Sequence, residues 1–231
     1  MTTTIAESLT QARTRLNQAL AEAGRAPDAA LLLAVSKTKP ADMIRDAYAL
    51  GQRDFGENYL QEALDKQAQL GDCPGIHWHF IGPLQSNKTR DVASHFDWVH
   101  GVDRAKIAQR LSDQRPDGLP ELNICLQVNV SGEDTKSGVS LEELPELASL
   151  AAALPRVRLR GLMAIPAPSE DPGAQRAPFR LLAEALSSLR RELPDAPLDT
   201  LSMGMSADLE AAVAEGATIV RLGTAIFGSR Q

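Results

Sequence analysis

The segment Leu31-Leu32-Leu33-Ala34-Val35-Ser36-Lys37 decides the fold class of this chain. It is short, apolar and continuous, which is typical of a β-strand that is buried on both faces of a parallel sheet. A helical pattern with apolar residues at three- and four-residue steps follows, opening at Pro40 and stopping at Gly51. The segment therefore predicts one strand–helix unit of an α/β fold.

The same unit recurs along the chain. Seven more strands are predicted, at Asp54–Glu57, Ile76–Gly82, Trp98–Val102, Leu122–Val130, Val157–Ile165, Thr200–Met203 and Ile219–Leu222. Further helices are predicted near Asn58–Leu70, Gln85–Ser94, Arg104–Gln114, Leu141–Leu154, Ala174–Leu193 and Ala207–Ala214. Alternating strands and helices indicate a parallel sheet, and eight units in 231 residues predict a closed TIM-type (β/α)8 barrel. An open doubly wound sheet is the alternative.

A further helix is predicted before the first strand. Apolar residues recur at helical spacing from Ile5 to Ala23, Thr4 and Glu7 fit a capping box, and Gly24 is a C-terminal stop. No helix is predicted after the eighth strand, so we expect the N-terminal helix to cover that position. No linker divides residues 1–231, which are expected to form a single barrel domain.

Composition excludes several classes of protein. The chain carries 24 Lys and Arg against 30 Asp and Glu, a net charge of −6, whereas a general nucleic-acid binder needs a basic surface. No apolar run approaches the roughly 18 residues of a membrane span, and the N-terminus lacks the pattern of a secretory signal. We therefore expect a cytoplasmic protein that binds neither nucleic acid nor membrane and, because no exposed apolar stripe is evident, is a monomer.

The histidines and cysteines do not predict a metal site. Cys73 and Cys125 are far apart and are expected to be free thiols. His77 and His79 project from one face of a strand, but a metal needs a third ligand. The other two histidines, His95 and His100, do not obviously converge on them, so ring packing or hydrogen bonding is favoured.

Function in such barrels gathers at the carboxyl ends of the strands. Lys37 is the only charged residue of the first strand, and an amine emerging there can attack an aldehyde to form a Schiff base. The alternative is that Lys37 only pairs with Glu57 at the end of the second strand. Lys136, in the 132–138 loop, could offer a second, weaker amine, although a solvated charge is the favoured interpretation.

The ends of the seventh and eighth strands suit a phosphate. Gly204 and Gly223 let backbone N–H groups converge on an anion, and Ser202, Ser206 and Thr224 add hydroxyl donors. Ordinary strand-to-helix turns are also rich in glycine and serine, so these two loops alone are weak evidence for a phosphate site. Together with the lysine they predict a ligand with an aldehyde at one end and a phosphate at the other, either pyridoxal phosphate or a sugar phosphate.

Over nearly its whole length the chain resembles the pyridoxal-phosphate homeostasis protein family, and its barrel is similar to the N-terminal domain of alanine racemases. The resemblance rests on these motifs: Ala34-Val35-Ser36-Lys37-Thr38, Phe55-Gly56-Glu57-Asn58-Tyr59, the run from His77 to Gln85 with Asn87-Lys88, Gly161-Leu162-Met163, the run from Leu201 to Asp208, and the run from Arg221 to Gly228. The third and fifth are long and specific.

The resemblance implies pyridoxal 5'-phosphate (PLP) held as an aldimine on Lys37. It further implies that Arg221 faces the pyridine nitrogen and that Asn58 lies near the ring. The groups implied to hold the phosphate are Ser206, Gly223 and Thr224, with the backbone near Met203-Gly204.

Three functions are open on this evidence. The family implies a carrier in PLP homeostasis without established turnover, with PLP-dependent apoenzymes as candidate recipients. A PLP-dependent racemase is the second, but racemases bring a tyrosine base from a second β-domain, which we do not expect here. A Schiff-base aldolase acting on a sugar phosphate is the third, and it would need carboxylates such as Glu57 or Asp208 near the lysine.

Overall fold

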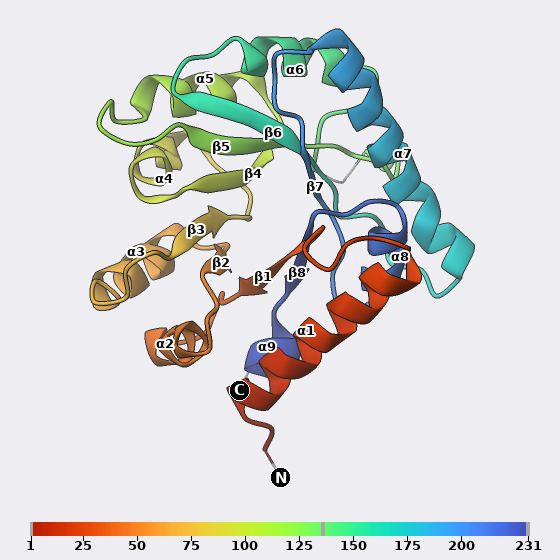
Figure 1. Ribbon diagram of the computed structural model, residues 1–231. Coiled ribbons are helices and arrows are strands. Elements are labelled where there is room, and N and C mark those ends of the chain that lie inside the picture. Colours follow the sequence, from red (N-terminus) through yellow and green to blue (C-terminus); the bar gives the residue numbers. More distant parts are fainter. Residues whose placement is uncertain (1, 135–136, 230–231) are drawn as a thin grey trace.

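The computed structural model describes residues 2–134 and 137–229, and they form a closed barrel of parallel strands (Figure 1). The strands pair in chain order and β8 closes on β1, which confirms the (β/α)8 prediction and excludes the open sheet. Their bounds are β1 Leu31–Val35, β2 Asp54–Glu57, β3 His77–Phe80, β4 Trp98–Val102, β5 Leu122–Gln127, β6 Val157–Met163, β7 Thr200–Ser202 and β8 Ile219–Leu222.

Helices follow the strands around the barrel. Their bounds are α1 Ile5–Glu22, α2 Ala41–Ala49, α3 Leu60–Gln69, α4 Thr89–His95 after a 3₁₀ turn at Ser86–Lys88, α5 Ala105–Gln114, α6 Leu144–Ala152, α7 Pro172–Glu192, α8 Leu209–Ala214 and α9 Thr224–Phe227. Several predicted strands run beyond the observed ones. β5 ends three residues early, because Val128 keeps only an isolated bridge to Val139 and the chain then leaves the ladder.

The N-terminal helix α1 is built as the sequence predicts. The Thr4 hydroxyl accepts from the Glu7 amide at 3.1 Å, and the Glu7 carboxylate accepts from the Thr4 amide at 2.9 Å. The helix packs against α2, α8 and α9 and so covers the barrel beside β8 (Figure 1). The prediction that no helix follows β8 was wrong, since the four-residue α9 forms where Ile226 and Phe227 both donate to the Gly223 carbonyl.

The buried part of the barrel contains polar as well as apolar side chains. Leu33, Val99 and Ile124 belong to an apolar core, whereas Glu57 and His79 are ionisable and fully buried. Burying such groups is costly unless they are hydrogen-bonded or paired with an opposite charge. None of the helices in the described part of the chain is long and apolar enough to cross a membrane.

Candidate functional site

Lys37 lies just beyond the end of β1. Its side chain is half-buried, and its amine has no hydrogen bond or ion pair with any residue in the described part of the chain. The alternative in which Lys37 pairs with Glu57 is therefore wrong. Lys37 presents an unengaged amine at the carboxyl end of a barrel strand.

Glu57 pairs instead with Lys66 of α3. The Lys66 ammonium lies 2.8 Å from Glu57 Oε1 and 2.6 Å from Glu62, and it donates to the Ser36 carbonyl at 2.7 Å. The Ser36 hydroxyl also donates to Glu57 Oε1, at 2.8 Å. Burial raises the pKa of Glu57, and the Lys66 charge opposes this rise. Sequence reasoning missed Lys66, because a lysine in a helical pattern normally faces solvent.

This network holds the backbone on both sides of Lys37. Ser36, which precedes it, is bonded through its hydroxyl and its carbonyl, and the Thr38 amide donates to Glu62 at 2.5 Å. Thr38 also has a φ of 63°, a left-handed conformation that few residues other than glycine adopt. The direction in which Lys37 leaves the strand is thus set by tertiary contacts to α3.

Asn58 follows β2 directly, as predicted. Its side-chain oxygen is buried and has no hydrogen-bond partner in the described part of the chain. A buried amide oxygen without a partner is costly, so this atom is one that a donor on a ligand would stabilise. The backbone of Asn58 is held by close packing, since a Cβ on Gly82 would lie only 2.6 Å from the Asn58 carbonyl oxygen.

The loop after β7 is shaped by a glycine and an aspartate. Gly204 has a φ of 102°, and a Cβ there would lie 2.7 Å from the Ala212 Cβ, so only glycine fits. The Asp208 carboxylate accepts from the Met205 amide at 2.7 Å, so it caps the loop rather than standing free beside the lysine, as the aldolase hypothesis would need. Ser206 is exposed at the turn.

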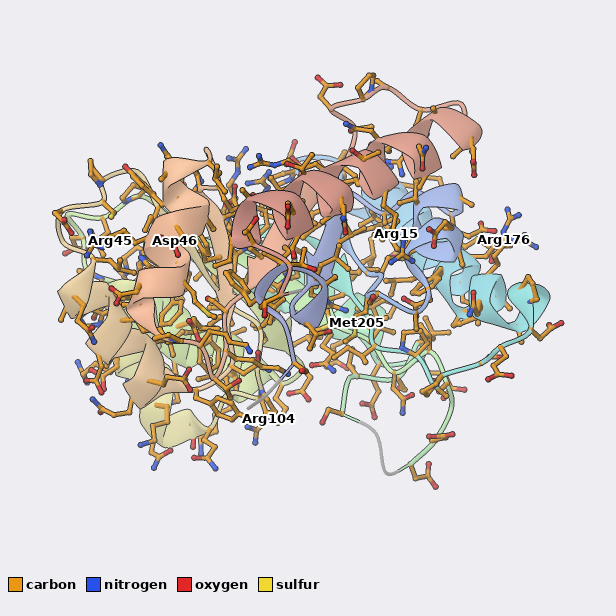
Figure 2. All side chains as sticks on the ribbon, turned by 90° about the horizontal axis from the view of Figure 1, so that it is seen from below. Arg15, Arg45, Asp46, Arg104, Arg176 and Met205 are labelled. Atoms are coloured by element: carbon orange, nitrogen blue, oxygen red, sulfur yellow. The ribbon has the colours of Figure 1, made fainter. Side chains whose placement is uncertain are left out.

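Arg15 of α1 secures this loop from outside. Its guanidinium donates to the Ser206 carbonyl at 2.6 Å and pairs with Glu210 at 2.7 Å. At the other end of α8, Arg176 of α7 pairs with Glu215 at 2.9 Å. Figure 2 shows Arg15, Arg176 and the loop residue Met205 in the same region of the molecule. Helices α1 and α7 therefore hold α8 and the loop before it.

The loop after β8 lies next to the strand that carries Lys37. A Cβ on Gly223 would lie 3.3 Å from the Val35 carbonyl oxygen. The residues that line a cavity of about 770 Å³ include Thr38, Thr224 and Ala225. Thr224 is exposed, and the backbone amides of Ser206, Thr224 and Ala225 make no hydrogen bond to any described residue. The loop after β8 thus offers unused donors next to the end of β1.

Arg221 is buried at the end of β8. It donates to the Ser202 hydroxyl at 3.3 Å and to the Ala164 carbonyl at 3.1 Å, and its backbone amide donates to the Gly204 carbonyl at 2.9 Å. Burial lowers the pKa of Arg221 to about 10, so the guanidinium is still cationic at neutral pH. Ser202 is also fully buried, and its hydroxyl is engaged with Arg221 inside the barrel. Met203 is fully buried.

The histidines are hydrogen-bonded, as favoured, but one expectation about them was wrong. His77 and His79 both reach Asp54, at 3.3 and 2.9 Å, which confirms that they share a face. His100, which was not expected to converge on them, lies 2.9 Å from His79. In residues 2–134 and 137–229, no three His, Cys, Asp or Glu side chains are grouped so as to hold a metal ion. The two cysteines are free thiols, as predicted, and Lys136 lies outside the described residues.

The chain is similar to known proteins over almost its whole length. A pyridoxal phosphate homeostasis protein of Pseudomonas aeruginosa is 62% identical over 227 residues, covering 98% of this chain and 96% of the relative. The protein of that name from Escherichia coli K12 is 54% identical over 228 residues, covering 98% and 97%. A structure of PipY from Synechococcus elongatus with PLP bound has a TM-score of 0.82 at 41% identity, covering 92% of this chain and 100% of PipY.

Solved structures of lower sequence identity are similar to this chain in fold alone. Alanine racemase from Corynebacterium glutamicum has a TM-score of 0.70 at 19% identity, and the alignment covers 96% of this chain and 61% of the racemase. Residues 8–231 match the alanine racemase N-terminal domain family. With relatives above 50% identity along almost its full length, the chain belongs to the pyridoxal phosphate homeostasis protein family, built on the alanine racemase N-terminal barrel.

Proposed function

We propose that this protein binds PLP in the cytoplasm, holds it as a Schiff base on Lys37 and makes it available to PLP-dependent apoenzymes without turning over amino acids itself. The observation that carries the proposal is the unengaged amine of Lys37 just beyond β1, with the loop after β8 and its unused donors packed against the same strand. The names of the relatives and the PLP bound to PipY support it.

The residues present fit PLP at both ends. The Lys37 amine would add to the aldehyde carbon, a C=N bond would form, and the aldehyde oxygen would leave as water. The donors of Ser206 and Thr224, with the Ala225 amide, would take the phosphate. The buried oxygen of Asn58, which has no partner in the described part of the chain, would accept from a donor beside the ring.

The phosphate should supply much of the affinity, because hydrogen bonds to a charged group are worth about 1.5–3 kcal/mol each. We expect Ser206→Ala and Thr224→Ala each to weaken PLP binding about tenfold. Pyridoxal, which lacks the phosphate, should bind the wild type far more weakly than PLP. Fluorescence titration checks both points, with Ser94→Ala as control, since that hydroxyl bonds only within its own helix. Equal affinities for PLP and pyridoxal would contradict the assignment.

Arg221 is the reason to expect no turnover. PLP supplies an electron sink, which works best when a carboxylate keeps the pyridine nitrogen protonated. Arg221 can only donate and is cationic, so it would disfavour a second positive charge at that nitrogen.

The protein with bound PLP should therefore neither racemise, transaminate nor decarboxylate the standard amino acids at an appreciable rate. Coupled assays and chiral analysis at high protein concentration measure this. Sustained racemisation that disappears in Lys37→Ala would overturn the carrier proposal in favour of a racemase.

A further inference from the structure

Five polar side chains form a continuous hydrogen-bonded chain through the barrel. Asp54 Oδ1 lies 2.9 Å from His79 Nε2, and His79 Nδ1 lies 2.9 Å from His100 Nε2. His100 Nδ1 lies 2.7 Å from the Ser202 hydroxyl, which accepts from Arg221 at 3.3 Å. The five residues come from β2, β3, β4, β7 and β8. The hydrogen-bonded series therefore connects opposite sides of the barrel and ends at Arg221, in the candidate PLP site.

With both histidines neutral, the Asp54 end determines the direction of every bond: Asp54 can only accept, so each ring carries its proton on Nε2 and His100 Nδ1 accepts from the Ser202 hydroxyl. Arg221 can only donate, so the Ser202 oxygen also accepts from it. His100 then carries its proton on Nε2 and donates to His79 Nδ1. His79 in turn carries its proton on Nε2 and donates to the Asp54 carboxylate, which can only accept.

This pattern requires both histidines to be neutral, and their surroundings agree. Burial lowers the pKa of both rings, that of His100 well below its usual value. His79 is faced by Asp54 and Asp97, which oppose the shift, and by His77. His100 is faced by the His79 ring and by the Arg221 cation, both of which disfavour its charged form.

This hydrogen-bonded series also limits the orientation of the Arg221 guanidinium. Two of its five N–H bonds are used, toward Ser202 and toward the Ala164 carbonyl. The other three have no acceptor in the described part of the chain. Because the two fixed bonds hold the planar guanidinium from one side, the remaining donors keep one orientation.

We propose that Ser202, His100 and His79 are positioning residues that hold the Arg221 guanidinium toward the pyridine nitrogen of PLP. This inference rests on the proposed function, and it gives Ser202 a different task from the phosphate donation predicted from the sequence. The Ser202 hydroxyl acts on the ring end of the ligand, through Arg221, while Ser206 and Thr224 act on the phosphate.

The first test needs no ligand. Two-bond ¹H–¹⁵N correlation spectra of the PLP-free protein should show the Nε2–H tautomer for both His79 and His100, unchanged as the pH is lowered through the usual histidine pKa. A proton on Nδ1 of His100 would overturn the proposal, whatever the protein binds.

The second test uses the Ser202 hydroxyl. We expect Ser202→Ala to weaken PLP about tenfold and to make the absorbance of bound PLP depend on pH, because the Arg221 guanidinium would no longer be held in one orientation toward the pyridine nitrogen. Ser202→Thr, which keeps the hydroxyl, should restore both properties. Thr200→Val removes a buried hydroxyl from the same strand that bonds to Asp199 and should behave as wild type.

The outcomes separate the two proposals. If the wild type forms no borohydride-reducible adduct with PLP, the proposed function fails. If the wild type forms it, and Ser202→Ala is folded with unchanged affinity and a pH-independent spectrum, the positioning role fails while the function stands.

Discussion

Replacing Lys37 with alanine should abolish the covalent attachment of PLP. The wild type, treated with PLP and then borohydride, is expected to retain one reduced adduct, found by mass spectrometry on the peptide that contains Lys37. In Lys37→Ala that adduct should be absent, because the unengaged amine at the end of β1 is the proposed nucleophile. Non-covalent binding through the phosphate donors should persist at reduced affinity.

The matched control is Lys39→Ala. Lys39 lies two residues further along the same loop, but its amine already donates to the Ser229 carbonyl at 2.8 Å. This variant should form the adduct as the wild type does. An adduct of wild-type yield in Lys37→Ala would refute the assignment, and peptide mapping would then decide whether Lys136 or another lysine carries it.

The second large effect is expected at Lys66, away from the ligand. Lys66→Met leaves the fully buried Glu57 carboxylate without its cation, and removing one partner of a buried ion pair costs about 3–5 kcal/mol. Since domains are stable by only about 5–15 kcal/mol, this is a large share of the total. Urea unfolding of the ligand-free protein measures the loss.

The pH dependence of that loss follows from Glu57. Its pKa is raised in the folded state, so stability falls as the pH rises from the usual glutamate pKa through the raised value. Without Lys66 the pKa should rise further, so the destabilisation should be greatest at neutral pH and should shrink on acidification. The double variant Glu57→Gln, Lys66→Met should recover most of the lost stability. A loss that is independent of pH and of the residue at 57 would show that Lys66 acts only by packing.

Much of the barrel could be predicted because its signals are local. A buried strand such as 31–37 is recognisable from a few consecutive apolar residues, and a helix such as α1 from spacing and its capping box. Strand ends were less accurate, because a strand ends where its neighbour stops pairing. Val128 illustrates this, since its apolar character continues the strand pattern but its partner is an isolated bridge.

The candidate site divides in the same way. The sequence by itself determined which residues stand at the strand ends, including Lys37, Asn58 and Arg221, because position along a strand is a local property. Only the tertiary structure decided their partners: Glu57 with Lys66 rather than Lys37, and Ser202 with His100 and Arg221. His100 and Ser202 are 102 residues apart in the chain. They meet because barrel closure brings distant strands across a common interior, where buried polar groups must find partners with one another.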